Sequence, residues 1–232
     1  MFFINKKKKE ILIEETNYWL SIGDLMASIL MIFMLLFIAK TIETGQELRK
    51  KEEIIEGFTG LKKNIISKIQ KDFEERGIKV DIDPQTGTIK IDDKILFNTG
   101  EYLLKPEGKQ YLNEFVPIYI NLLLNDRQVK KELSQIIIEG HTDDVGSYIY
   151  NMELSQKRAF EVIKYIYDEM PDFKGREELK SYITANGRSN IKVLRDDSGN
   201  IDRDKSRRVE FQFKLKEDET LMKIEKTLKE GN

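Results

Sequence analysis

One carboxylate of the sequence stands where a charge costs free energy. Asp24 is the single charged residue in YWLSIGDLMASILMIFMLLFIA, a run of about 22 residues at 18–39. An ionised acid at the centre of a membrane helix costs about 2.5–3.5 kcal/mol on insertion scales. Asp24 therefore either serves a structural role, bonded to headgroups or to a neighbouring helix, or carries an ion along the helices of a partner.

A second group of polar side chains surrounds a predicted junction between a strand and a helix. The chain reads IIIEGHTDDVGSYIYNMELSQKRA at 136–159, so Asp143 follows an apolar strand and Arg158 lies on the next helix. Asn151, Leu154 and Arg158 are spaced i, i+3 and i+7 and share one stripe of that helix. The anion and the cation form either a structural salt bridge or a binding site.

This junction resembles the signature of the OmpA-like domains, IEGHTD followed by G, N, LS and RA at the family's spacing. Two flanking segments are also similar to that family, ILFNTGEYLLKPEGKQYL at 95–112 and SRRVEF at 206–211. The resemblance covers roughly residues 80–215. It implies a domain that binds peptidoglycan through the diaminopimelate of the peptide stem.

The resemblance also implies roles for single residues. The side-chain end of diaminopimelate carries an ammonium and a carboxylate on one carbon, so its site needs a fixed anion and a fixed cation. Asp143 and Arg158 occupy the two positions that the family uses for this purpose, and Arg158 can donate two parallel hydrogen bonds. An acid is more usual in the family where this chain has Asn98. The other residues expected at the site are Thr142, Asn151, Leu154, Phe97, Asn98 and Arg207.

The elements that must position these residues follow from hydrophobic periodicity and turn residues. The turn PQTG at 84–87 predicts a hairpin, and Pro106 marks the start of a helix. The expected order is a β-hairpin, a helix, a strand, a helix and two strands, at 78–92, 105–125, 134–139, 153–170, 181–185 and 208–215. The fold class is therefore α+β, a sandwich with helices on one face of a mixed sheet.

The N-terminal part predicts one membrane helix. Roughly 20 apolar residues span a bilayer, and the run here continues into Lys40 without the small residues of a signal cleavage site. Four lysines at 6–9 precede it, so the N-terminus is expected in the cytoplasm and the rest outside. The expected segments are a basic tail at 1–17, the membrane helix at 18–40, a helical linker at 41–77, the OmpA-like domain at 78–216 and a charged helix at 217–232.

The linker is rich in Lys and Glu and reads as one or two exposed helices, punctuated by Gly45, Gly57 and Gly60. It serves either as a solvated spacer or as a plug that lies on the membrane.

Composition excludes several classes of function. The chain has no cysteine and one histidine, His141, so neither a metal site nor a cofactor is expected and His141 is expected to be a satisfied buried residue. A net charge of −2 gives no bulk attraction for nucleic acid. The sequence has no phosphate-binding loop, dinucleotide fingerprint or nucleophile elbow, so it does not read as an enzyme.

The order of these parts resembles the MotB family, in which the membrane aspartate carries the ion. The run around the acid departs from the Tyr-Ala-Asp-Phe-Met type of the flagellar proteins. It is instead similar to the MotB-like subunit of Zorya anti-phage defence systems, at Trp19, Ser21, Asp24, Leu25, Met26 and Ala27. That resemblance implies a homodimer in the bacterial inner membrane, with its outer domain in the periplasm.

The same resemblance implies that the two helices stand inside a ring of a multi-helix, MotA-like partner, where Asp24 carries H⁺ or Na⁺. A flagellar stator subunit and a non-conducting anchor between membrane and wall are the alternatives.

Overall fold

The computed structural model describes the backbone of residues 2–216, and the side chains of 19, 22–46, 48–49 and 60–216. The helix expected at 217–232 lies outside the described residues. The chain divides into two compact units, Met1–Gly57 and Phe58–Asn232, and each is described by itself.

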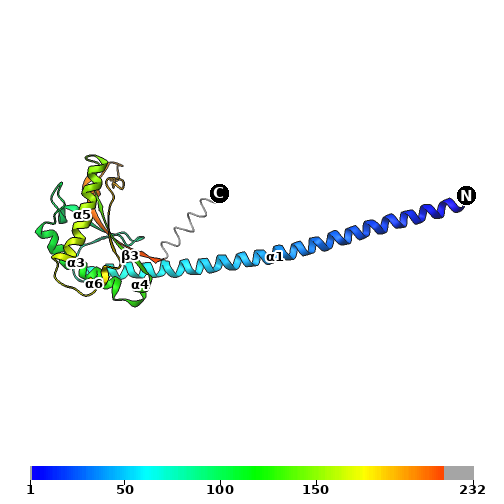
Figure 1. Ribbon diagram of the computed structural model, residues 1–232, viewed down its shortest axis with the longest axis horizontal. Helices are drawn as coiled ribbons and strands as arrows, with labels where there is room; N and C mark the ends of the chain where they lie inside the picture. The colour runs from blue at the N-terminus through cyan, green and yellow to red at the C-terminus, as the bar shows by residue number, and fades with distance from the viewer. Residues whose placement is uncertain (1, 217–232) are drawn as a thin grey trace. The chain divides into compact units, whose positions relative to one another are not determined.

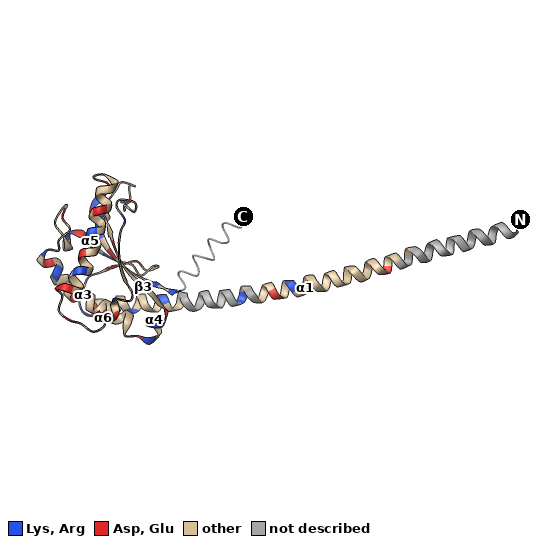
Figure 2. Ribbon diagram, in the orientation of Figure 1, with Lys and Arg blue, Asp and Glu red and all other residues tan. Residues whose placement is uncertain are grey.

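Helix α1, Phe2–Glu75, makes up the first unit and continues into the second. It contains the span Ile22–Gln46, which is long and apolar enough to cross a membrane and overlaps the expected span of 18–40. Figure 2 shows little red or blue on the ribbon along this part of α1, so few of its residues are charged. The glycines at 45, 57 and 60 do not end the helix, since one glycine costs only about 1 kcal/mol in a helix interior.

The second unit is built on a mixed sheet of five strands in the order β1-β2-β5-β3-β4. Strands β3 and β4 are parallel, and the other neighbours are antiparallel. The hairpin forms at the predicted turn, where the Asp83 carboxylate accepts hydrogen bonds from the backbone N–H groups of Gln85 and Thr86 at 2.9 and 2.8 Å. The strands are β1 Asp81–Ile82, β2 Ile89–Asp92, β3 Leu133–His141, β4 Ile183–Gly187 and β5 Arg208–Leu215.

Two long helices, α3 and α5, cover one face of this sheet (Figure 1), and the predicted α+β class is confirmed. Helix α5 begins earlier than predicted because the Ser147 hydroxyl caps it, accepting from the N–H of Tyr150 at 3.2 Å. Gly140 permits the close packing of β3 on α5, since a Cβ there would lie 2.2 Å from the carbonyl oxygen of Ser155. The helices after α1 are α2 Asp93–Leu96, α3 Pro106–Leu124, α4 Arg127–Glu132, α5 Tyr148–Asp168, α6 Arg176–Leu179 and α7 Arg203–Ser206.

The end of α1 belongs to the core of the second unit, so the compact unit starts at Phe58 and not at the expected residue 78. Its apolar side chains recur at helical spacing, and Ile69 and Phe73 are fully buried. The Phe73 ring stacks on Phe115 of α3 with centroids 5.2 Å apart. This part of the expected linker is therefore structural and is not a solvated spacer.

Replacing Phe73 by Ala tests this assignment. The substitution should lower the free energy of unfolding by about 3–5 kcal/mol, because it leaves a cavity beneath α3. Lys71→Ala is the control, since the Lys71 side chain is 74% exposed and its pair with Glu75 is a surface one. Denaturant unfolding monitored by circular dichroism would measure both, and equal stabilities of the two variants would contradict the burial of this helix end.

Candidate functional site

The predicted site residues meet at one edge of the sheet, where β2 and β3 end and β5 begins. Arg208 at the start of β5 pairs with Asp92 on one side and with His141 on the other. Asp93 and Arg207 lie one residue beyond their strand ends and Asp143 lies two residues beyond the end of β3, so all three come to the same edge. Helix α5 begins directly after this edge and adds its own side chains.

Arg158 of α5 is the buried centre of the group, with 1% of its surface exposed. Its Nη1 lies 2.9 Å from Oδ1 of Asp93, and its Nε donates to the carbonyl oxygen of Glu101 at 2.8 Å. A longer bond of 3.4 Å runs from Nη2 to the carbonyl oxygen of Asn98. The Phe97 ring lies against the guanidinium, with its centroid 5.1 Å from Cζ of Arg158. All of these contacts come from one segment, 93–101.

Burial dominates the electrostatics of the Asp93–Arg158 pair. It raises the pKa of the Asp93 carboxyl to about 6, although the charges of Arg158 and Arg207 oppose the rise. Burial also lowers the pKa of Arg158, against the charge of Asp93. Removal of either partner would leave a buried charge without compensation, so each residue requires the other.

Asp143 does not pair with Arg158 but with Arg207, whose Nη1 donates to its Oδ2. The other carboxylate oxygen accepts from the N–H of Val145 at 3.0 Å, which fixes the loop after β3. The Nη2 of Arg207 donates to Asp204 of α7. Arg207 is more accessible than Arg158, with 24% of its side chain exposed, whereas Asp143 is buried, with 11% of its side chain exposed.

The other predicted residues of the strand and helix lie at the same place. The Asn151 amide donates to the carbonyl oxygen of Val145 at 2.9 Å and weakly to that of Asp143 at 3.4 Å, so it braces the loop. The Thr142 hydroxyl is buried and has no hydrogen-bond partner among the described residues. Leu154 is half-buried.

The segment after α2 forms the other wall of the site. Phe97 is buried, whereas Asn98 is exposed and donates to the Glu101 carboxylate at 3.0 Å. Gly100 turns this segment with a φ of +76°, a left-handed conformation that suits glycine. Tyr150, half exposed on the first turn of α5, has its hydroxyl 3.9 Å from the place of a Cβ on Gly100. An aromatic side chain therefore stands at the rim, between the two loops.

Two residues of the site were not predicted from the sequence. Asp93 is the buried counter-ion of Arg158, and Asp204 is the exposed second partner of Arg207. Both lie in short charged stretches, IDDK at 91–94 and DRDK at 202–205, which look like solvated surface. The burial of Asp93 becomes apparent only in the structure, where the strand ends come together.

His141 lies on the other face of the sheet and is buried, as expected. It is not satisfied as expected, because neither ring nitrogen has a hydrogen-bond partner among the described residues, and it lies instead in an ionic network. Its Nε2 lies 3.2 Å from Glu139 and 3.5 Å from Glu210. These three residues have a spacing that could hold a metal ion. However, Arg188 and Lys192 contact Glu139 at 2.8 and 3.2 Å, so these cations already supply the positive charge.

Arg208 completes this network by pairing with Glu210 at 2.7 Å. Burial raises the pKa of both carboxyls, but His141 and the neighbouring cations outweigh it and bring the pKa of Glu139 and of Glu210 to about 2. The group is therefore an ion-pair network that ties β3 to β5.

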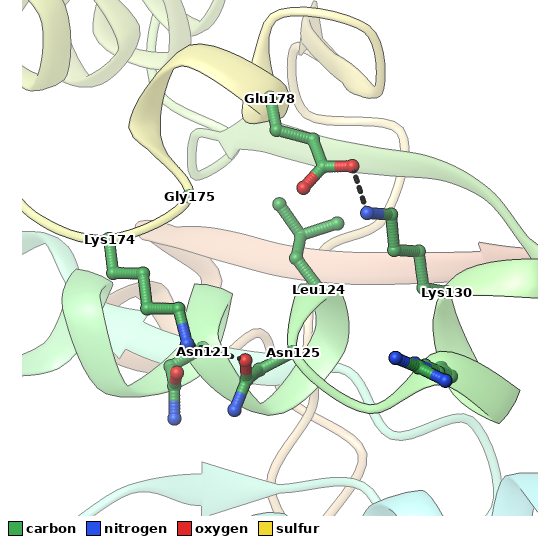
Figure 3. A pocket seen from close by; sticks show the side chains of 8 residues that line it. Asn121, Leu124, Asn125, Lys130, Lys174, Gly175 and Glu178 are labelled. Carbon is green, nitrogen blue, oxygen red and sulfur yellow. Dashed lines mark hydrogen bonds and ion pairs between the residues drawn. The ribbon is translucent and has the colours of Figure 1, made fainter.

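A hollow of about 290 Å³ lies near the beginning of β3, at the opposite end of that strand from the charged site (Figure 3). Lys174 donates to Asn125 at 2.7 Å, and Lys130 pairs with Glu178. These polar groups of the hollow therefore satisfy one another.

Comparison of the sequence with known proteins finds the following relatives. The model of the OmpA family matches residues 96–207. Zorya protein ZorB from Escherichia coli strain Crooks is 31% identical over 209 residues, which cover 85% of this chain and 88% of that protein. Zorya protein ZorB from Escherichia coli O139:H28 is 27% identical over 184 residues, which cover 78% of this chain and 70% of that protein.

Among solved structures, the crystal structure of a MotB-like protein from Desulfovibrio vulgaris has the same fold. It matches with a TM-score of 0.51 at 22% identity, over 68% of this chain and 94% of that chain.

The network around His141 predicts a loss of stability in acid. The Glu210 carboxyl has a pKa of about 2 in the folded protein against an ordinary value of 4.5. Its ionised form thus stabilises the fold above pH 4.5, and this contribution disappears as the pH falls from 4.5 to about 2. Glu210→Gln should remove on the order of 3 kcal/mol of that pH dependence.

Urea unfolding at a series of pH values would measure the effect, with Glu114→Gln as the exposed control on α3. An unchanged pH dependence in Glu210→Gln would show that the network does not stabilise the fold.

Proposed function

This chain belongs to the family of the Zorya protein ZorB, and we propose that it is a stator-type subunit of an ion-driven motor in the bacterial inner membrane. It anchors the motor to peptidoglycan and serves anti-phage defence. The observation that carries the proposal is the extent of the likeness, which spans 88% of a ZorB protein and exceeds the OmpA segment at 96–207. The likeness thus includes more than a wall-binding domain.

The charged edge of the second unit is the anchor. The Asp143 carboxylate and the Arg207 guanidinium lie side by side, Arg207 partly exposed and Asp143 mostly buried, and the buried Arg158 lies at the same end of the sheet. Such a pair complements the side-chain end of diaminopimelate, which carries an ammonium and a carboxylate on one carbon. Asn151, Thr142, Leu154, Phe97 and Asn98 shape or support the same site. The peptide stem of peptidoglycan is therefore its ligand.

The membrane helix supplies the ion path. Asp24 is exposed on α1, within the apolar span Ile22–Gln46. Lipid would leave its carboxylate without a polar partner, so helices of other subunits must surround it. Two copies of the chain place their α1 helices inside a ring of a multi-helix, MotA-like partner. Asp24 then takes up H⁺, or binds Na⁺, on the outer side and releases it on the inner side.

Two further features support this arrangement. The four lysines at 6–9 keep the N-terminus in the cytoplasm, so the second unit lies in the periplasm, where the wall is. Each charge that crosses the membrane provides about 2.3 kcal/mol per 100 mV. An anchored pair of helices lets the partner ring turn against a fixed support.

Asp24→Asn tests the ion path. The amide keeps the size of the side chain but cannot exchange a proton, so the motor should assemble and protection against phage should be lost. Glu43→Gln is the matched control, because Glu43 is an exposed acid of the same helix that pairs with Lys40 at 2.9 Å. Efficiency of plating and co-purification of the partner would be measured, and full protection by Asp24→Asn would contradict the ion-carrier role.

Asp143→Asn tests the anchor. Loss of one charge-assisted contact with the ligand ammonium should weaken retention on purified peptidoglycan sacculi by about tenfold or more. Asp144→Asn is the control, since its carboxylate is bound to Arg203 at 2.8 Å in the same loop. The detergent-solubilised full chain would be assayed by sedimentation with sacculi. Equal retention of Asp143→Asn and wild type would remove this residue from the site.

A further inference from the structure

The hollow near the beginning of β3 is lined by more cations than anions (Figure 3). Three segments form it, namely the end of α3, helix α4 and residues 174–178. Among the described residues that line it, Arg127, Lys130 and Lys174 stand against one acid, Glu178. The hollow therefore carries a net positive charge.

Two of these cations are not neutralised by any described acid. The Arg127 side chain is exposed and has no partner among the residues that the structure describes. Lys174 donates to the side-chain oxygen of Asn125, a neutral group, at 2.7 Å. Lys130 pairs with Glu178, but the two side chains are 41% and 38% exposed, so this pair is weak. A guanidinium and ammonium groups around one hollow suit a phosphate.

Further cations surround the hollow. The Lys131 side chain is 82% exposed, and its contact with Glu132 is long, at 3.8 Å. Lys216, directly after β5, is exposed and donates to the carbonyl oxygen of Lys131 at 2.5 Å. The cations form a basic face, which consists of Arg127, Lys130, Lys131, Lys174 and Lys216. Such a face is wider than one small anion and fits a surface that bears many phosphates.

The basic face is tethered to the membrane span by a short stretch of chain. Within the second unit, Lys68 of α1 donates to the Asp126 carboxylate at 2.9 Å, and Asp126 caps α4. Helix α1 therefore passes beside the basic face. Residues 47–57 connect the apolar span, which ends at Gln46, to the second unit, and they extend over at most about 40 Å. The surface of the membrane is thus within reach of this face.

The proposed anchor lies at the other end of the same strand. Strand β3 has nine residues, so its two ends are about 30 Å apart. Contact of the basic face with the membrane would direct the charged edge away from the bilayer and toward the wall.

On the proposed function, which places the second unit between membrane and wall, we propose that the basic face binds anionic phospholipids of the inner membrane. The hollow receives the phosphate of one headgroup, which Arg127 and Lys174 hold, while Lys131 and Lys216 meet neighbouring headgroups. The ligand class is a glycerophospholipid with a net negative headgroup, such as phosphatidylglycerol. The second unit thus has a contact with the membrane in addition to its contact with the wall.

The test uses the full chain in lipid nanodiscs made of phosphatidylcholine, or of equal parts of phosphatidylcholine and phosphatidylglycerol. Because the chain has no cysteine, Gln128→Cys carries a single fluorophore on the exposed side of α4. Quenching by nitroxide-labelled headgroups measures contact with the membrane. Quenching should be clearly stronger in the mixed bilayer, because each cation near an anionic surface strengthens binding by about fivefold.

Arg127→Gln combined with Lys174→Gln tests the hollow. Loss of two cations should lower the equilibrium constant for contact with the mixed bilayer by about 25-fold. Lys157→Gln combined with Lys205→Gln is the matched control, which removes two exposed cations of α5 and α7 and should leave the quenching unchanged. Glu178→Gln removes the acid of the hollow and should strengthen the contact.

Equal quenching in both bilayers, or an equal loss in the two double variants, would overturn the inference. Soluble glycerol phosphate is a separate probe, added to the full chain in detergent and followed by calorimetry. Binding of this probe without any effect of phosphatidylglycerol in the nanodiscs would assign the hollow to a free phosphate, against a membrane contact. Loss of wild-type retention on sacculi is a different result, which would overturn the proposed function and not the lipid contact.

Discussion

The burial of the Arg158 guanidinium is the constraint on which the site depends. A buried guanidinium must have partners for its donors, and segment 93–101 supplies the Asp93 carboxylate and two carbonyl oxygens. These bonds fix the wall of the site against α5. As a result, Asp143 pairs with Arg207 and not with Arg158.

The rest of the second unit keeps these charges in place. The network of Glu139, His141 and Glu210 ties the end of β3 to the start of β5, and these are the strand ends that carry Asp143 and Arg207. The end of α1 packs in the same core through Ile65, Ile66, Ile69 and Phe73.

Local signals in the sequence predict much of the fold. Pro106 marks the start of α3, the PQTG turn joins β1 to β2, and alternating apolar residues define β5. The same signals place Asp143, Asn151 and Arg158 near one another. They do not reveal that Asp93 neutralises Arg158, because that contact joins residues far apart in the chain. The burial of Ile69 and Phe73 likewise depends on tertiary contacts. Their charged neighbours in the sequence make this segment look exposed.

The claim that the buried Arg158 holds segment 93–101 against α5 can be tested on the arginine side chain itself. Its Nε–H signal can be followed by ¹⁵N nuclear magnetic resonance during exchange with heavy water. Arg158 Nε–H, which donates to the carbonyl oxygen of Glu101, should exchange slowly with solvent. Exchange as fast as that of an exposed arginine would contradict the claim.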